Sequence, residues 1–181
     1  SRSDGLNLPE NVIDNYADTA GFSHYVWYEK SGVNPVPDTA AYDNASHAGI
    51  NFANVTNEWV NGYGCVFWWG HGSETAVYRK YWNCDDDGDG VPESDEMSWP
   101  TFFTNADTGN LDDAKPSIVY QSSCHNGCPE NGSNLGYALL QEGAVATVSA
   151  SRVSWYRIGT WGLSSNPNNT NIGYIFFSHI V

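Results

Sequence analysis

The chain is poor in positive charge: 7 of its 181 residues are Lys or Arg, against 21 Asp and Glu, and the formal net charge is −14. Nucleic acids and anionic membranes attract proteins through Lys and Arg, so this composition disfavours both as partners. It favours cationic ligands such as calcium or basic peptides instead. Because lysine is scarce while Asn, Ser, Thr and Gly are common, we expect a secreted or cell-surface protein.

Long hydrophobic runs are also missing. No apolar run approaches the ~20 residues that a membrane-spanning helix needs, so we expect no membrane insertion. The sequence contains no signal-peptide pattern and begins with Ser1 instead of a start methionine, so we expect a mature or trimmed chain. Four N-x-Ser/Thr sequons, which begin at Asn44, Asn54, Asn131 and Asn168, give weak further support for secretion.

Aromatic residues, in contrast, are abundant, with 8 Trp, 11 Tyr and 7 Phe, and 181 residues suit a single domain with a sizeable core. The pattern predicts helices over about 52–62, 133–142 and 172–181, and strands over about 24–28, 63–70, 117–123 and 144–150. Residues 31–49 and 81–116 are predicted to be loops. Strand, helix and strand over 117–150 form a right-handed βαβ unit with parallel strands. The sequence therefore predicts an α/β domain with a mostly parallel sheet flanked by helices.

Two apolar strands end in residues that bear chemistry. Within 64–74, an apolar run ends in His71, which lies between two glycines. Within 118–127, an apolar strand ends in Cys124, 53 residues further along the chain. In open α/β sheets, ligands bind at the carboxyl ends of the strands. A thiol becomes a nucleophile when a base favours its thiolate form. We therefore expect Cys124 as nucleophile, His71 as its acid/base, and the amides of Gly72 and Cys124 as oxyanion donors.

His125 is the competing base, but successive strand residues point to opposite faces, so His71 is preferred. A zinc site formed by His71, Cys124 and His125 is a weaker alternative, because these residues lack a paired ligand spacing.

At these residues the chain resembles a known family. The segment 70–76 looks like the histidine segment of the gingipain-type cysteine peptidases, which are relatives of caspases and legumains. The segment 123–127, in which Cys is followed by one residue and then Asn-Gly, is similar to the family's nucleophile segment. The run 143–151 also fits, and Ser154-Trp155 resembles a segment that lines the primary specificity pocket. The resemblance covers roughly residues 60–157 without the acidic loop.

The resemblance implies a caspase-like three-layer sandwich and endopeptidase activity, with protein or peptide substrates, through Cys124 and His71. It also implies substrate binding by Ser154 and Trp155, and cleavage after Arg or Lys. The carboxylate of such a pocket is not identified; upstream candidates are Asp14, Asp18, Asp38, Asp43 and Glu58. Caspase-like domains usually continue with further strands. We therefore expect one domain over 1–181 that is incomplete, is a processed fragment, or is completed by a partner chain.

An acidic segment, inserted at about 82–100, matches the twelve-residue calcium-loop pattern. Its expected ligands are Asp85, Asp87, Asp89, the Val91 carbonyl, Glu93 through water, and Glu96 as the bidentate end. Gly90 permits the tight turn, and the flanking residues predict no full pair of helices. We expect calcium to bind here and to stabilise the protein.

The remaining cysteines leave alternatives open. Cys65 lies in a strand and is expected in the core, whereas Cys84–Cys128 is a plausible bridge in an oxidising compartment. A Cys124–Cys128 bridge would instead cap the nucleophile. The second interpretation of the chain is therefore a catalytically silent, calcium-binding structural or assembly module on the same fold.

Overall fold

A computed structural model describes residues 7–29, 31–33, 45–46, 49–156 and 168–180. Its contacts divide the chain into two compact units. The first unit contains 1–49, 81–98 and 155–181, and the second contains 50–80 and 99–154. The expectation of a single domain is not decided by this division and stays a prediction. No helix of the described residues is long and apolar enough to cross a membrane.

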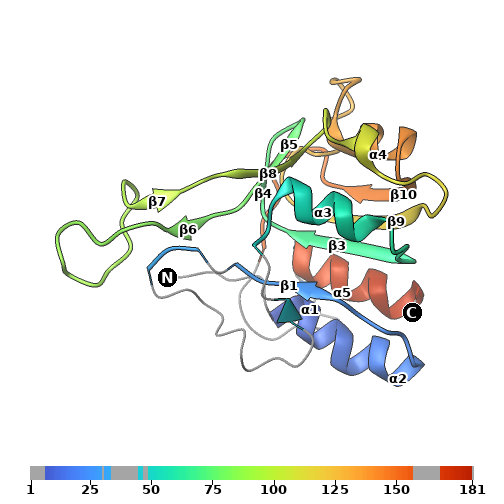
Figure 1. The fold of residues 1–181 in the computed structure, drawn as a ribbon, viewed down its shortest axis with the longest axis horizontal. Helices are drawn as coiled ribbons and strands as arrows, with labels where there is room; N and C mark the ends of the chain where they lie inside the picture. Colours follow the sequence, from blue (N-terminus) through green and yellow to red (C-terminus); the bar gives the residue numbers. More distant parts are fainter. Residues whose placement is uncertain (1–6, 30, 34–44, 47–48, 157–167, 181) are drawn as a thin grey trace. The chain divides into compact units, whose positions relative to one another are not determined.

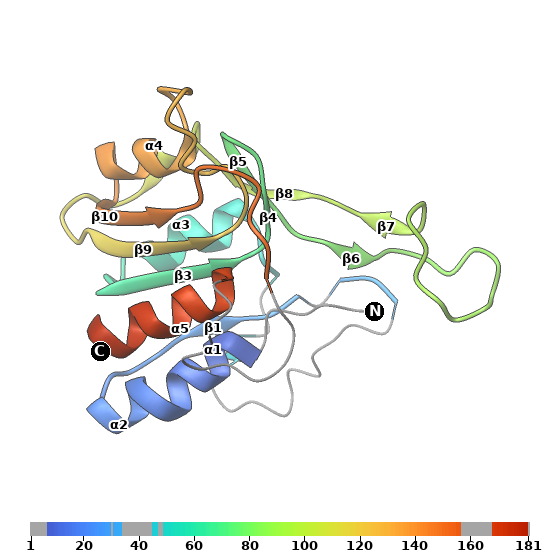
Figure 2. The ribbon, with the colours of Figure 1, turned by 180° about the vertical axis from the view of Figure 1, so that it is seen from behind.

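The second unit is built on a parallel sheet with the strand order β10-β9-β3, in which the three strands lie side by side (Figure 2). The strands are β3 (Cys65–Trp69), β9 (Ser117–Ser122) and β10 (Ala144–Ser149). Helix α4 (Leu135–Gln141) joins β9 to β10, which confirms the predicted βαβ unit. Its N-cap is Asn134, whose side chain accepts a bond from Tyr137 N, and Gly143 follows its end with φ of 85°.

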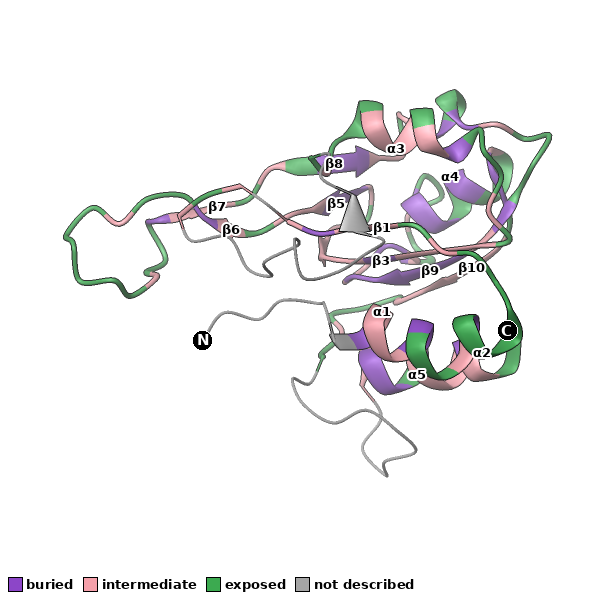
Figure 3. Ribbon diagram, turned by 60° about the horizontal axis from the view of Figure 1, so that its bottom comes forward, coloured by how far each residue is buried: buried purple, intermediate pink, exposed green. Residues whose placement is uncertain are grey.

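Helices α3 (Phe52–Trp59) and α4 pack on the same face of this sheet, and buried residues gather between them and the strands (Figure 3). Trp59 of α3 and Leu135 and Leu139 of α4 belong to one core cluster with Val119 of β9. These four side chains expose 3% of their surface or less. The α/β class, with a parallel sheet flanked by helices, is confirmed.

Beyond β3 the second unit forms a three-stranded antiparallel sheet in the order β4-β5-β8. The strands are β4 (His71–Gly72), β5 (Ala76–Tyr78) and β8 (Thr101–Thr104), and the 3-10 turn η3 (Thr108–Asn110) follows. The prediction of loop throughout 81–116 was therefore wrong for β8. Phe102 and Phe103, which we did not recognise as a strand, are buried in the same core as Val77. His71 itself starts a new strand instead of ending β3.

The first unit contains α1 (Asn7–Val12), the π-helical turn η1 (Ile13–Ala17), α2 (Asp18–Ala20) and α5 (Asn169–Ile180) (Figure 1). The rings of Tyr16 and Tyr174 join η1 to α5 at a centroid distance of 5.1 Å. The sequence pattern predicts no helix over residues 1–24, because polar residues interrupt their apolar spacing. The predicted helix over 172–181 is confirmed and begins three residues earlier.

Two short ladders complete the first unit. Strand β1 (Val26–Trp27) pairs in parallel with β2 (Ala45–Ser46), so the predicted loop over 31–49 was wrong at 45–46, while 34–44 and 47–48 lie outside the described residues. Strands β6 (Tyr81–Trp82) and β7 (Met97–Ser98) are antiparallel, and the acidic loop connects them (Figure 1).

Candidate active site

His71 and Cys124 follow the ends of two neighbouring parallel strands, β3 and β9, at equivalent positions in the register. Trp69 of β3 pairs with Ser122 of β9, and Gly70 N donates to Ser122 O at 3.1 Å. His71 and Cys124 each lie two residues beyond that pair. The register therefore delivers both to the carboxyl edge of the sheet, where the sequence predicted them.

Gly72 packs directly against the backbone of Cys124. A Cβ atom at Gly72 would lie 2.9 Å from Cys124 N and closer still to the Cys124 carbonyl oxygen, so no larger residue fits without movement of the backbone. This close approach joins the histidine segment to the nucleophile loop. It also explains the glycine after His71 better than a sharp turn does, since Gly72 is a strand residue.

At this contact, the backbone amides of Gly72 and Cys124 could bind an oxyanion. Ser73 N donates to Ala76 O at 3.0 Å, and His71 and Gly72 then pair with Tyr78 and Val77. Hydrogen-bonded and non-hydrogen-bonded pairs alternate along an antiparallel ladder, so the Gly72 N–H is not used by β5. The Cys124 N–H has no acceptor among the residues that the structure describes. Two adjacent amides that the fold leaves uncommitted can stabilise a negatively charged oxygen.

Asn126 ties the two segments together from a fully buried position. Its Nδ2 donates to Ser73 O at 2.6 Å and to Ala76 O at 3.1 Å, across the turn between β4 and β5. Its Oδ1 accepts from the Ser123 hydroxyl, which itself accepts from Trp68 Nε1 at 3.3 Å. All of these groups are neutral, so the network positions the site without buried charge.

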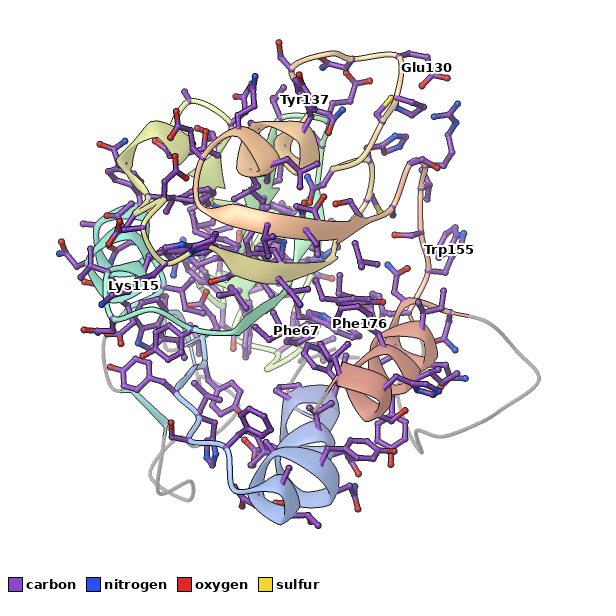
Figure 4. All side chains as sticks on the ribbon, turned by 90° about the vertical axis from the view of Figure 1, so that its right-hand side faces the viewer. Phe67, Lys115, Glu130, Tyr137, Trp155 and Phe176 are labelled. Carbon is purple, nitrogen blue, oxygen red and sulfur yellow. The ribbon has the colours of Figure 1, made fainter. Side chains whose placement is uncertain are left out.

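The Cys124 thiol lies against Ser154. Cys124 Sγ donates to Ser154 O at 3.4 Å and accepts from Ser154 N at 3.4 Å, and the Ser154 hydroxyl is 3.8 Å from the sulfur. Ser154 is thus brought to the nucleophile. Trp155 follows it in the chain, belongs to the first unit, and exposes 77% of its surface (Figure 4). Neither residue's role in substrate binding is decided by these contacts.

His71 contacts an aromatic ring and lies near a positive charge. Its imidazole meets Trp99 edge-on with ring centroids 4.4 Å apart, and Lys80 Nζ lies 4.3 Å from the Trp99 centroid. Burial of His71 lowers its pKa below 6.5, and the Lys80 ammonium lowers it further. Both causes favour the neutral imidazole, which is the form that accepts a proton.

His125 adopts a left-handed conformation with φ of 61°, which is costly for a residue with a side chain. Its N–H donates to Arg152 O at 3.1 Å, and its carbonyl accepts from Cys128 N. Because β9 ends at Ser122, the strand alternation that we used against His125 does not apply. The nucleophile lies in a tight turn. Among the described residues, no group of three potential metal ligands contains a histidine or a cysteine, so the zinc interpretation gains no support.

The four cysteines are free thiols in this structure. Cys128 is buried and its Sγ donates to Glu130 Oε2 at 3.2 Å, which raises the pKa of the Cys128 thiol. Arg152 pairs with Glu130 through two bonds of 2.9 and 2.5 Å and holds the pKa of that carboxyl at about 2. Cys65 is half-buried and is not part of the core cluster, so the expected core position was wrong; burial still raises the pKa of its thiol to about 12, as for an unreactive residue.

Of the upstream carboxylates, the described contacts assign none to a pocket floor. Glu58 accepts from Asn61 Nδ2 at 2.7 Å and from the Tyr63 hydroxyl, near the amino end of β3 and thus at the opposite end from His71. Asp18 lies 3.2 Å from His24 within the first unit, as measured from Oδ1 to Nδ1. Asp14 is in η1 of the same unit, whereas Asp38 and Asp43 lie outside the described residues.

The acidic loop folds around its own carboxylates. Asp85 accepts from Gly88 N and Gly90 N, Asp87 accepts from Asp89 N, and Asp89 accepts from Val91 N. Carboxylate oxygens of Asp85, Asp87 and Asp89 lie within 4.8 Å of one another. Three such oxygens at calcium-loop positions 1, 3 and 5 fit the ligand set that calcium prefers.

Glu96 occupies the twelfth position and is 1% exposed. It accepts from Asp86 N, Trp82 Nε1 and Glu93 N at 2.8, 2.8 and 3.1 Å, and the Asp86 bond is the main reason why its pKa is lowered. Its carboxylate groups with Asp86 and Asp87, not with Asp85 and Asp89. Repulsion by Asp87 raises the pKa of Glu93, as expected where carboxylates converge.

An α/β fold that brings a histidine and a cysteine to neighbouring strand ends, beside two uncommitted amides, defines the class of caspase-like cysteine hydrolases. The model of one protein family, Peptidase family C25, matches residues 4–181, and the chain belongs to this gingipain-type cysteine peptidase family. The match extends beyond the 60–157 on which the sequence resemblance rested. No curated protein and no solved structure matches the chain.

Sequence reasoning missed three residues of this site. Asn126 was noticed only as part of a motif, and nothing in the local pattern shows that its amide spans 50 residues or more to reach Ser73 and Ala76. Trp99 was taken as a flank of the acidic loop, and Lys80 was not singled out. Both residues could have been predicted from the antiparallel pairing of 76–80 with 99–104. The sequence indicates that pairing only weakly, through the pattern of apolar and polar residues around Phe102 and Phe103.

Proposed function

We propose that this chain is a cysteine endopeptidase in which Cys124 is the nucleophile and His71 the general acid and base. The observation that carries the proposal is their common register at the sheet edge, together with the contact of Gly72 on the Cys124 backbone. The family supports the same reaction class, since its members are cysteine peptidases.

In the proposed reaction, neutral His71 takes the Cys124 thiol proton while the sulfur attacks the scissile carbonyl carbon. The carbonyl π electrons move to oxygen, and the amides of Gly72 and Cys124 stabilise that oxyanion. Collapse breaks the C–N bond, and His71 gives its proton to the leaving amine. Water, deprotonated by His71, then attacks the thioester, releases the acid product and restores the thiol.

We infer a preference for cleavage after Arg or Lys, because the gingipain-type resemblance implies it and the net charge of −14 favours basic ligands. The substrates are then proteins or peptides with an exposed basic residue. The same acidic, lysine-poor composition supports secretion, which fractionation of the producing cells tests: an intracellular mature protein would contradict it.

We also propose that calcium binds the loop 85–96 and stabilises it. Asp85, Asp87 and Asp89 would hold the ion through carboxylates, with the Val91 carbonyl, Glu93 through water, and Glu96 as further ligands. The convergence of three carboxylates and the repulsion on Glu93 support this assignment. Unchanged melting temperature and activity on chelation would contradict it.

The alternative function is a silent calcium-binding module. The Cys124 thiol donates to Ser154 O, and this bond occupies the proton that His71 must take. In an active enzyme, substrate binding must redirect that proton. Nothing among the described residues identifies a partner chain, so completion of the domain by a partner stays a prediction.

One experiment separates the two functions. The reduced protein, with calcium, is treated with iodoacetamide, the labelled cysteine is mapped, and Arg, Lys and Asn peptide substrates are tested. We expect rapid labelling of Cys124 that is lost in His71→Ala, and cleavage that is lost in Cys124→Ala and kept in the control Cys84→Ala. Slow labelling of Cys124 without cleavage, while calcium still raises the melting temperature, would favour the silent module.

A further inference from the structure

Lys80 and Trp99 form a cross-strand pair just beyond the ladder of β5 and β8. Tyr78 pairs with Thr101, and Arg79 N donates to Pro100 O at 2.9 Å. The same antiparallel register places Lys80 directly opposite Trp99. The ammonium lies 4.3 Å from the centre of the indole, within the range of a cation–π contact.

This pair lies on the face that carries His71. His71 of β4 pairs with Tyr78, and side chains two residues apart on a strand share a face, so Tyr78 and Lys80 project with His71. The 4.4 Å between the centroids of His71 and Trp99, with planes at 61°, is a close edge-on contact. The pairing of β4, β5 and β8 thus brings Trp99 to the imidazole and Lys80 to the indole.

No hydrogen bond joins the His71 imidazole to a carboxylate among the residues that the structure describes. In nucleophile–base pairs, a third group normally orients the base. Here the described neighbour that contacts the ring is Trp99, and it is partly exposed, at 45%. Trp99 is too exposed to contribute much to the core. Its position between the Lys80 ammonium and the His71 ring is better explained by a role at the histidine.

We propose that Trp99 and Lys80 are positioning residues for His71: the indole, with the Lys80 ammonium on its ring, holds the orientation of the imidazole. Through its charge, the ammonium also opposes protonation of His71. This inference rests on the proposed pairing of His71 with Cys124. It predicts that His71 is a neutral base in the resting enzyme, so that the nucleophile is a thiol and not a preformed thiolate–imidazolium pair.

The charged and titratable groups around His71 are few. Lys80 and Tyr78 come from β5 and its extension, Cys124 comes from the nucleophile loop, and Arg79 faces the opposite side of β5. Lys80 is the one whose charge shifts the histidine, and it acts in the same direction as burial, towards a lower pKa. Because Lys80 is exposed, salt must weaken its effect.

The test for Lys80 is a titration of His71 by NMR in the full, reduced chain with Lys80→Met. We expect the His71 midpoint to move to higher pH than in the wild type, and 1 M NaCl to shrink this difference. Lys115→Met is the control, because Lys115 is also exposed but its Nζ donates to Val60 O. Figure 4 shows Lys115 at the other end of the sheet from Glu130, which lies in the loop that follows the nucleophile. An unchanged midpoint in Lys80→Met would overturn the role of Lys80.

The test for Trp99 is the rate of Cys124 alkylation by iodoacetamide as a function of pH. Loss of an aromatic contact predicts a plateau rate roughly 2- to 10-fold lower in Trp99→Leu, and Trp99→Phe should recover most of it. Tyr137→Leu, an equally exposed aromatic on α4, is the control. If Trp99→Leu and Tyr137→Leu react alike, Trp99 has no positioning role. Should Trp99→Leu misfold, Trp99→Met takes its place, with the same expected loss relative to Trp99→Phe and Tyr137→Leu.

The NMR titration observes His71 directly, and the alkylation rate observes Cys124 directly. Neither measurement therefore depends on peptide cleavage. A shifted titration and a slowed alkylation in a protein that cleaves no peptide would uphold the positioning role and reject the endopeptidase. Normal cleavage with neither effect would uphold the endopeptidase and reject the positioning role.

Discussion

At the edge of the parallel sheet, the loop around Cys124 is held by neutral, buried groups, whereas the acidic loop 85–96 is held by carboxylates bonded to its own amides. Asn126 is fully buried and satisfies its donors and acceptor within the protein. Asp87 and Asp89, in contrast, are exposed and crowd together. The first region is complete as folded, and the second carries repulsion that a cation would relieve.

The largest effect is expected from Gly72→Ala. The added methyl collides with the Cys124 backbone, so the two amides must separate and peptide cleavage should fall by about 100-fold or more. Gly64→Ala is the matched control, because a Cβ there meets nothing within 4 Å. Activity is measured with the preferred peptide, and equal activity of the two variants would show that this contact does not build the site.

The next largest effect is expected from Asn126→Ala, and it is an effect on the stability of the fold. It removes the buried side-chain donor from Ser73 O and one of two donors from Ala76 O, which keeps its bond from Ser73 N. For this change we expect a loss of about 2–4 kcal/mol in the free energy of unfolding. Urea unfolding measures it. Asn110→Ala, which removes one exposed bond to Asp107 O, serves as the control and should change little.

For the acidic loop, the comparison is between Glu96→Gln and Asp95→Asn, which remove the same charge from neighbouring positions. Calcium at 100 times its Kd should raise the melting temperature of the wild type by roughly 5–10 °C. We expect Glu96→Gln to lose most of this increase and Asp95→Asn, which is outside the ligand pattern, to keep it. Equal responses in calorimetry would mean that bulk charge, and not a defined site, attracts the ion.

The smallest effect is expected from the exposed pair of Arg152 with Glu130. Because Arg152 holds the pKa of Glu130 at about 2, below the ordinary 4.5, the pair stabilises the folded state above about pH 4.5 and loses this contribution as the pH falls towards 2. Arg152→Gln should therefore lower the urea midpoint slightly at pH 6 and not at all near pH 2. A difference that grows towards acid pH would contradict this sign.

The sequence predicted the elements that local pattern controls. Helix α3 has Asn51 at its N-cap and Phe52, Val55 and Trp59 at helical spacing, and the apolar runs of β3 and β9 were placed within two residues. The antiparallel strands were missed, because β4 and β5 are two and three residues long and carry too little alternation to be recognised. The helices over residues 7–20 were missed for lack of a continuous apolar face.

By itself, the sequence determined the family and the α/β class, and it predicted His71 and Cys124 as the candidate catalytic pair, because strand-end motifs and apolar periods are local properties of the chain. Tertiary structure decided how those residues are held. Gly72 against Cys124, Asn126 across to Ser73, and Trp99 beside His71 are contacts between segments that are 28 to 53 residues apart. Such contacts depend on strand register, because the pairing of β3 with β9 sets which residues of the histidine segment lie level with the nucleophile turn.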